Sequence, residues 1–190
     1  MLIFVGAQKI KTNMMHKKTM TELDRLSIEA YKEQPKIPLV IVLDNVRSAL
    51  NVGSAFRTAD AFALEALVLC GITAQPPHRE IMKTAVGADQ SVDWAYFENT
   101  IDALAHYQAK GYKTFAVEQA SDSIALQTFQ WPNNPVAIFF GNEVEGVSEA
   151  VLAKVDGCIE IPQFGTKHSL NISVSLGIVL WELFSKYKGW

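Results

Sequence analysis

Three loops rich in polar residues follow short apolar runs of strand length in this 190-residue chain, at residues 45–57, 141–146 and 162–171. The side chains in these loops that could act on a substrate are those of Asn51, Arg57, Glu143 and Asn171. A carboxylate can orient an arginine or an amide through charge-assisted hydrogen bonds, so we expect Glu143 to orient Arg57 or Asn51. Ligands of open α/β sheets bind just outside the carboxyl ends of the strands. The three loops are therefore expected to meet in one functional site.

The third loop leads from an apolar strand at 158–161 into a long apolar helix, whose expected first residues are Ser169, Leu170 and Asn171. The first N–H groups of a helix have no partner inside the helix and can bind a ligand. The loop itself contains Pro and Gly and is polar where its flanks are apolar. This loop and the helix start are therefore a candidate ligand site.

Each of these residues also has an ordinary structural interpretation. Ser169 or Asn171 could cap the last helix, and Asn51 could cap the helix expected at 51–62. Glu143 could be a solvated turn residue. Arg57 could pair with Asp60 on one helix face, an interaction worth only about 0.2–0.5 kcal/mol.

Composition limits the class of protein. An apolar content of 49% over 190 residues is typical of a single domain with a real core. The net charge of −3 and the pI near 5.8 argue against nucleic-acid binding through bulk charge. A local basic patch remains compatible with this balance, and basic residues do cluster near the N-terminus, at Lys9, Lys11, His16, Lys17 and Lys18.

The two cysteines, Cys70 and Cys158, lie in or beside apolar runs and belong to no CxxC or Cys/His ligand pattern. We therefore expect free thiols in a reducing cytoplasm and no metal site. No apolar run approaches the length needed to cross a membrane. A soluble cytoplasmic protein is the expectation.

Strand-like and helix-like runs alternate along the chain. Strands are expected at 39–45, 66–70, 94–97, 113–117, 136–140 and 158–161. Helices are expected at 21–32, 51–62, 79–86, 101–110, 147–155 and 170–187. This alternation predicts an α/β fold with a mostly parallel sheet and helices on both faces. Residues 37–190 are expected to form that domain, after a basic segment with a short helix at 1–36.

The two commonest nucleotide-binding loops, Gly-x-Gly-x-x-Gly and the Walker motif, are absent from the sequence, and so is the Gly-x-Ser-x-Gly elbow. A parallel sheet alone would still permit a flavodoxin-like protein that binds a nucleotide or a flavin. That possibility stands as an alternative.

Taken together and in this order, the three loops resemble the three motifs of the SpoU/TrmH family of RNA ribose 2′-O-methyltransferases, part of the SPOUT superfamily. The motifs appear as LDNVRSALNVGSAFRTADAF (43–62), FFGNEVEGV (139–147) and IEIPQFGTKHSLNISVS (159–175). The resemblance covers about residues 37–186. It implies a deep trefoil knot at the C-terminal end, which would not be proposed otherwise because knotted chains are so rare.

The resemblance also implies a cofactor, S-adenosylmethionine (AdoMet), held in a bent shape largely by backbone groups of the knot loops. By position, this assigns cofactor binding to Val117, Glu118, Gln119, Gly141, Asn142, Ile161, Gln163, Ser169 and Leu170. Gly141 and Gly146 fit this role, because a missing side chain lets the backbone approach the ligand closely.

In such an enzyme the 2′-oxygen must be positioned near the methyl group and must lose one proton. The resemblance implies catalytic roles for Arg57, Asn51, Glu143, Asn171 and Ser169. A charged guanidinium has no acceptor site. An RNA phosphate as proton acceptor, fixed by Arg57, therefore fits the charges better.

The substrate implied is tRNA or rRNA. Candidate RNA contacts are Arg47, His78, Arg79, Lys83, Lys167 and His168. The last helix is apolar on more than one face, so it must be buried on several sides, and the resemblance implies a C2 homodimer that forms near the knot. A relative that binds RNA or AdoMet without transferring a methyl group is a second alternative.

Overall fold

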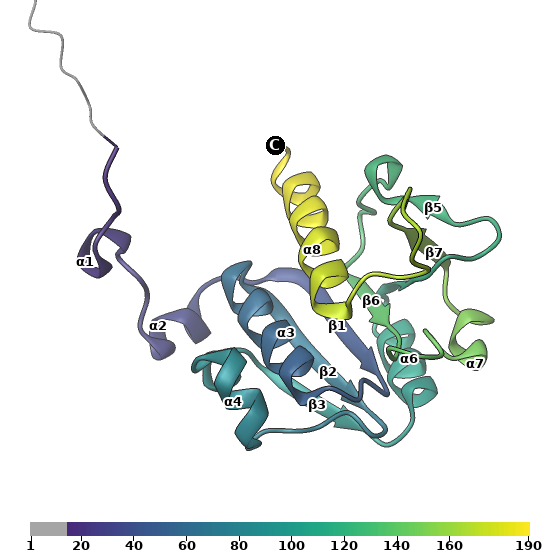
Figure 1. Cartoon of the computed structure of the whole chain (residues 1–190), viewed down its shortest axis with the longest axis horizontal. Helices are drawn as coiled ribbons and strands as arrows, with labels where there is room; N and C mark the ends of the chain where they lie inside the picture. Colours follow the sequence, from purple (N-terminus) through teal and green to yellow (C-terminus); the bar gives the residue numbers. More distant parts are fainter. Residues whose placement is uncertain (1–14) are drawn as a thin grey trace, which may run out of the picture.

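The computed structural model describes residues 15–190, and its centre is a seven-stranded parallel sheet (Figure 1). The strands are β1 (Ile37–Asp44), β2 (Leu64–Cys70), β3 (Trp94–Phe97), β4 (Lys113–Val117), β5 (Ile124–Ala125), β6 (Val136–Phe140) and β7 (Gly157–Glu160). Their order across the sheet is β3-β2-β1-β6-β4-β7-β5. The central strands β1 and β6 are buried on both faces, as expected for runs of β-branched and apolar residues in a parallel sheet.

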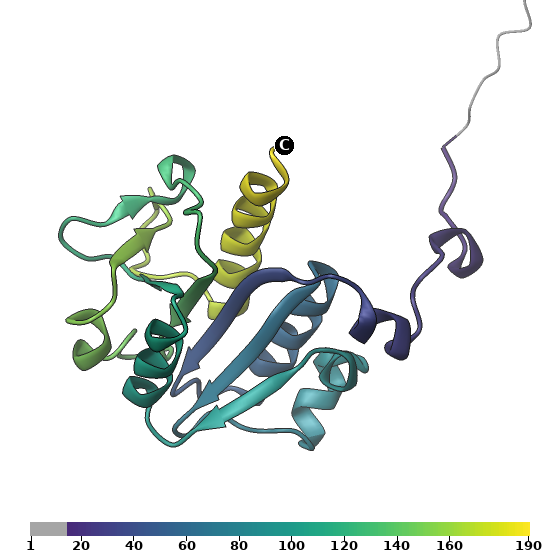
Figure 2. The same cartoon turned by 180° about the vertical axis from the view of Figure 1, so that it is seen from behind.

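Helices cover both faces of this sheet (Figures 1 and 2). One face packs against α3 (Ala49–Ala61), α4 (Arg79–Ala85), α5 (Ala88–Ser91) and α8 (Ile172–Lys188). The other packs against α6 (Thr100–Ala109) and the short α7 (Glu149–Leu152). Alternate residues of β1 serve the two cores, Leu39 and Ile41 on the first face and Val40 and Val42 on the second. The predicted α/β fold with helices on both faces is confirmed.

Strand β7 lies between two strands that follow each other in the sequence. Ile159 of β7 pairs with Val117 of β4 on one side and with Ile124 of β5 on the other. The chain therefore crosses from one side of β7 to the other within residues 118–123. It then passes through a short 3-10 helix, η1 (Leu126–Thr128), before it enters β6.

The helix predicted at 21–32 is wrong as a single element. The structure has α1 (Met20–Leu23) and α2 (Ile28–Glu33), because Asp24 adopts a left-handed conformation that ends the first helix. Thr19 and Ser27 cap these two helices. Most of this segment extends away from the body of the molecule (Figure 1). Of the basic cluster expected near the N-terminus, Lys9 and Lys11 lie outside the described residues.

Other boundaries also differ from the sequence prediction. The helix expected at 147–155 is only the four-residue α7. The last helix begins at Ile172, so Ser169, Leu170 and Asn171 precede it. The helix expected at 51–62 begins two residues earlier and is capped by Ser48, and not by Asn51. Within residues 15–190, no helix combines the length and the apolar character needed to cross a membrane.

Candidate active site

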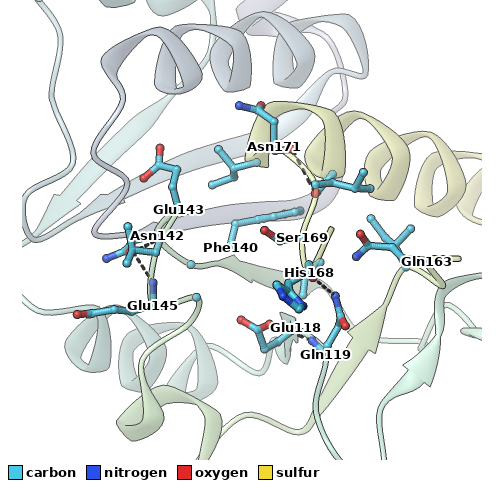
Figure 3. A pocket seen from close by; sticks show the side chains of 18 residues that line it. Glu118, Gln119, Phe140, Asn142, Glu143, Glu145, Gln163, His168, Ser169 and Asn171 are labelled. Atoms are coloured by element: carbon cyan, nitrogen blue, oxygen red, sulfur yellow. Dashed lines mark hydrogen bonds between the residues drawn. The ribbon is translucent and has the colours of Figure 1, made fainter. Parts of the chain in front are cut away.

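The second and third polar loops border a cavity of about 470 Å³ at the carboxyl ends of β4, β6 and β7 (Figure 3). The first loop contributes no lining residue and joins the other two through hydrogen bonds of Asn51. All the residues that the sequence assigned to cofactor binding line this cavity: Val117, Glu118, Gln119, Gly141, Asn142, Ile161, Gln163, Ser169 and Leu170. Three of the predicted catalytic residues, Glu143, Ser169 and Asn171, line it as well. The expected convergence of the loops is therefore present in the structure.

Glu143 joins the second loop to the first. Its Oε2 atom accepts a hydrogen bond from the backbone N–H of Arg47 at 3.1 Å. Its Oε1 atom accepts one from the N–H of Ser48 at 3.3 Å and one from the Asn51 side-chain amide at 2.9 Å. A carboxylate that faces three donors fixes the start of α3 against the turn at 141–147.

These contacts also set the charge of Glu143. Partial burial pushes the pKa of its carboxyl upward, but the hydrogen bonds from Arg47, Asn51 and Ser48 outweigh that effect and lower the pKa below its ordinary value. Glu143 is therefore an ionised acceptor at neutral pH, and it orients Asn51. The structure records no hydrogen bond or ion pair between Glu143 and Arg57 in the described chain.

Asn171 joins the third loop to the same cluster. Its amide nitrogen donates to Asn51 Oδ1 at 3.4 Å, and its own Oδ1 accepts from the Ser173 backbone N–H at 2.9 Å. The capping interpretation of Asn171 is thus confirmed, since this residue is the N-cap of α8. As it caps the helix, the Asn171 side chain also lies beside Asn51, so Asn171 has a structural role and belongs to the site as well. Ser169 does not cap the helix.

The turn at 141–147 is shaped by its two glycines. An added Cβ on Gly141 would lie 1.8 Å from the carbonyl carbon of Gly146, and one on Gly146 would lie 2.2 Å from Glu118 Oε2. Gly146 also has a φ of +73°. The missing side chains therefore let backbone atoms and the Glu118 carboxylate pack against the turn. Both glycines line the cavity, and a close approach of their backbone to a ligand stays a prediction.

Two side chains near β4 complete the cavity wall. The carboxylate of Glu118 accepts hydrogen bonds from the backbone N–H groups of Gln119 and Val147, at 3.0 and 3.1 Å. The side-chain amide of Gln119 donates to the carbonyl oxygen of His168 at 2.6 Å. Glu118 thus fixes the glycine turn, and Gln119 fixes the third loop (Figure 3).

Arg57 lies apart from this cluster within the chain. It is exposed on α3, does not line the cavity, and has no hydrogen bond or ion pair with any residue from 15 to 190. It follows Asn51 by six residues, which is about 9 Å along the helix axis. The ion pair with Asp60 considered from the sequence is absent among the described residues. Asp60 instead accepts a hydrogen bond from the Ser91 hydroxyl at 2.6 Å.

The candidate RNA contacts fall into two groups. His168 lines the cavity, Lys167 is exposed beside it, and the backbone of Arg47 is held by Glu143. Arg79 and Lys83 belong to α4, and His78 directly precedes this helix; all three lie outside the cavity lining. The His78 ring caps that helix by accepting from the Glu80 N–H at 3.2 Å, so a structural role for His78 is present.

Sequence reasoning missed the buried carboxylate of Asp44, at the end of β1. It accepts hydrogen bonds from the side chains of Asn45 and Thr100 and from the backbone N–H of Ser148, at 3.0 Å for the last. It therefore ties together three segments at the edge of the site. The only signal for it in the sequence was a single charged residue at the end of an otherwise apolar run.

Sequence reasoning also missed other residues that line the cavity: Phe140, Val144, Glu145, Ile172 and Ser175.

No group of three or more His, Cys, Asp or Glu side chains that could hold a metal ion occurs in residues 15–190. The two cysteines of this part of the chain are free thiols, and burial raises the pKa of Cys70 to about 12. The groups that face the cavity are thus amides, carboxylates and backbone donors.

The sequence is similar to those of known RNA methyltransferases. The model of the SpoU rRNA Methylase family matches residues 38–181. The tRNA (guanosine(18)-2′-O)-methyltransferase of Thermus thermophilus is 31% identical over 163 residues, which cover 85% of this chain and 82% of that protein. The 23S rRNA (guanosine-2′-O-)-methyltransferase RlmB of Vibrio parahaemolyticus is 29% identical over 87% of this chain and 66% of its own length.

Solved structures show the same relationship. The TrmH/SpoU tRNA modifying enzyme of A. aeolicus superposes with a TM-score of 0.74 and 25% identity, over 85% of this chain and 81% of that one. The AdoMet-bound rRNA methyltransferase of Sinorhizobium meliloti gives a TM-score of 0.73 with 27% identity, over 86% and 61%. Several relatives are longer than this chain, which spans only 9% of the mouse tRNA (guanosine(18)-2′-O)-methyltransferase TARBP1.

Proposed function

Because the chain belongs to the SpoU rRNA Methylase family, we propose that it transfers a methyl group from AdoMet to a ribose 2′-hydroxyl of tRNA or rRNA. The observation that carries this proposal is the cluster of Asn51, Glu143 and Asn171, which borders the cavity that the predicted cofactor residues line. Relatives named as tRNA and rRNA 2′-O-methyltransferases support the reaction class. The family match speaks against the flavodoxin-like alternative.

The cavity suits AdoMet in size and in chemistry. Its volume of about 470 Å³ lies within the range of about 300–1,000 Å³ that is usual for small-molecule sites. The backbone N–H groups of Ser169 and Leu170 have no acceptor among residues 15–190, so they are available to a ligand. AdoMet supplies an activated methyl group on a positive sulfur. In the proposal, the loops at 117–119, 141–146 and 161–170 hold it.

The protein's own groups then have to place the ribose and stabilise its developing charge. Orientation of reacting groups can supply on the order of 7–11 kcal/mol. In the proposal, Asn51, which Glu143 orients, and Asn171 hold the ribose, and Ser169 lines the same cavity as Asn171. Arg57 is proposed to bind an RNA phosphate that accepts the 2′-proton, because a charged guanidinium cannot accept it.

A homodimer is part of the proposal. Helix α8 leaves an apolar stripe exposed in the single chain, formed by Val174, Ile178 and Trp181, which are 49%, 40% and 54% exposed. Burial of such side chains against a second copy would be favourable, since each apolar side chain contributes about 1.5–3 kcal/mol when it is fully buried. Helix α3, which carries Arg57, packs against α8. We propose that Arg57 serves the cavity of the partner protomer, because it stands outside its own.

The trefoil knot is also proposed. Residues 118–135 leave β4, pass to the far side of β7 and return to β6, so they form a loop that spans β7. The chain continues from β7 through 161–171 and enters α8, which packs against α3. Passage of this segment through the loop at 118–135 would account for the third loop lying against Gln119.

The domain bounds and the RNA contacts are proposed from where the residues lie in the sequence and in the structure. We propose that residues 37–190 are the methyltransferase domain, in line with a family match that begins at residue 38, and that residues 1–36 help to bind RNA. Arg47, Lys167 and His168 would contact RNA near the cavity, and His78, Arg79 and Lys83 would do so on α4. The free cysteines fit a cytoplasmic location.

The experiment is methyl transfer from tritium-labelled AdoMet to total tRNA and rRNA from a strain that lacks the gene. The expected result is incorporation at one nucleotide, mapped to the ribose 2′-oxygen. Calorimetry with AdoMet and with FMN accompanies it. AdoMet binding without incorporation into either RNA pool would favour the inactive relative, and FMN binding without AdoMet binding would overturn the proposal.

A further inference from the structure

A second cavity, of about 310 Å³, lies next to the first at the carboxyl edge of the sheet. The two cavities share Asn142, Glu145 and Gly146, so the turn at 141–147 is the wall between them. The rest of the second cavity is lined by Asp44, Asn45, Arg47, Ile72 and Ser148. None of these five residues lines the proposed AdoMet cavity.

Hydrogen bonds hold the walls of the second cavity in place. Asn45 Oδ1 accepts from the Ile72 N–H at 3.2 Å, and Glu143 holds the Arg47 N–H at 3.1 Å. In the shared wall, Asn142 and Gly146 exchange two backbone hydrogen bonds of 3.0 Å. The second cavity is therefore preformed, which reduces the ordering cost of binding a ligand.

The side chains that line the second cavity include a charged one, Arg47, and an apolar one, Ile72. Arg47 is exposed, and its guanidinium has no hydrogen-bond or ion-pair partner in residues 15–190. Ile72 is 65% exposed although it is a large apolar residue, and its backbone is fixed. A free guanidinium suits a phosphate, and an aliphatic side chain can pack against the face of a nucleobase.

We propose that the second cavity binds a nucleotide of the RNA substrate, with Arg47 on its phosphate and Ile72 against its base. This rests on the proposed function: an RNA whose ribose lies in the AdoMet cavity can extend across the shared wall into the second cavity. A bound nucleotide there would place the RNA strand in register with the methyl donor. Arg47 and Ile72 would then be RNA-binding residues that leave AdoMet affinity unaffected.

The test compares Arg47→Ala and Ile72→Ala with the wild type, using the RNA that the methyl-transfer assay identifies. Arg47→Ala is expected to raise the KM for RNA about tenfold, which corresponds to about 1.4 kcal/mol. It should also lower the slope of log affinity against log salt by about 0.7–1, because one phosphate contact is lost. Ile72→Ala is expected to raise the KM severalfold without changing the salt slope.

Matched controls are Lys154→Ala for the loss of one exposed positive charge and Ile124→Ala for the loss of an aliphatic side chain at the opposite edge of the sheet. Neither should change the KM for RNA.

If both cavity variants keep the wild-type KM for RNA and the wild-type salt slope, the inference is wrong while the methyl-transfer activity stands. A weaker AdoMet affinity in either variant would also overturn it, by showing that the cofactor extends into the second cavity. Absence of transfer by the wild type would instead refute the proposed function.

Discussion

At the scale of single residues, Glu143 connects all three polar loops, directly or through Asn51. Its carboxylate accepts from Arg47, Ser48 and Asn51, and Asn51 in turn accepts from Asn171. A neutral side chain at this position would hold the same donors less strongly, since hydrogen bonds to an ionised acceptor are roughly twice as strong. The charge of Glu143 is therefore part of the architecture of the site.

Glu143→Gln should change how stability depends on pH. The pKa of Glu143 is lowered in the folded protein, although partial burial by itself would raise it. Its stabilising contribution is thus fully present above the ordinary value of 4.5 and is lost as the pH falls through the lowered folded value. We expect the variant to be about 1 kcal/mol less stable at neutral pH, with the difference in Tm narrowing below about pH 4.

Thermal melts of both proteins across this pH range provide the measurement. Glu149→Gln is the matched control, because Glu149 is exposed and its side chain accepts no hydrogen bond from residues 15–190. A constant Tm difference between wild type and Glu143→Gln at all pH values would contradict the assigned role of the charge.

Arg57→Lys should lower methyl transfer severely while leaving AdoMet binding intact. Lysine keeps the positive charge but lacks the planar fork that binds a phosphate through two parallel hydrogen bonds. We expect a loss in kcat of about 10²-fold or more, as for removal of a donor that stabilises transition-state charge. AdoMet affinity should be unchanged, because Arg57 does not line the cavity of its own chain and its proposed role in the partner's cavity is to bind an RNA phosphate. Retention of most of the rate under saturating RNA would contradict the proposed role of Arg57.

At the scale of elements, the turn between β6 and α7 is fixed by close backbone packing. Gly141 lies against the backbone of Gly146 and Val147, and Gly146 lies against Glu118. A strand end, a glycine turn and the end of β4 are thereby held as one unit. This unit forms the wall between the two cavities.

Gly141→Ala is expected to destabilise the protein and to weaken AdoMet binding together. The new Cβ would lie 1.8 Å from the carbonyl carbon of Gly146, so the turn must move, at a cost of roughly 1–3 kcal/mol or more. The matched control is Gly165→Ala, where an added Cβ meets nothing within 4 Å and the change should stay within about 0.5 kcal/mol. Equal Tm and equal AdoMet affinity for the two variants would refute this packing argument.

Among the secondary-structure elements, the sequence predicts several strands with their observed bounds but overestimates the length of one helix. The strands at 94–97, 113–117 and 136–140 have the bounds that the sequence predicts. For β6 the reason is that a strand buried on both faces is a continuous apolar run. The helix expected at 147–155 shrinks to α7, although its residues have the right pattern. The chain there must turn back to pair β7 with β4, which is a constraint of tertiary packing and not of local propensity.

At the scale of the whole molecule, α8 exposes an apolar stripe of Val174, Ile178 and Trp181 in the single chain. We expect a mass near twice 21.0 kDa in solution at micromolar concentration. Trp181→Glu should shift it toward the monomer, because a charge buried in an apolar interface is costly. Light scattering on both proteins measures this. Wild-type protein at the monomer mass would contradict the dimer.

Mixing Arg57→Lys with Glu143→Gln tests whether the site is shared. Glu143→Gln is expected to lose activity too, because Asn51 loses its charged acceptor. If Arg57 acts on the partner's cavity, a mixed dimer of Arg57→Lys and Glu143→Gln chains contains one site with both residues intact. After subunit exchange about a quarter of the wild-type sites should be restored, since half of the dimers are mixed. If Arg57 acts in its own chain, every site in the mixture lacks one residue, and activity stays at the level of the separate variants.

The sequence alone determined the layered α/β fold and the three loops, because apolar runs and their polar ends are local properties of the chain. The resemblance to a known family supplied most, but not all, of the residues that line the cavity. Only the tertiary structure decided which polar groups meet. It paired Glu143 with Asn51 and the start of α3 and left Arg57 outside the cluster. It also filled the space beside Gly141 with backbone and opened a second cavity at Arg47 and Ile72. The physical reason is that hydrogen bonds between residues about ninety positions apart depend on strand order and register, which no local pattern specifies.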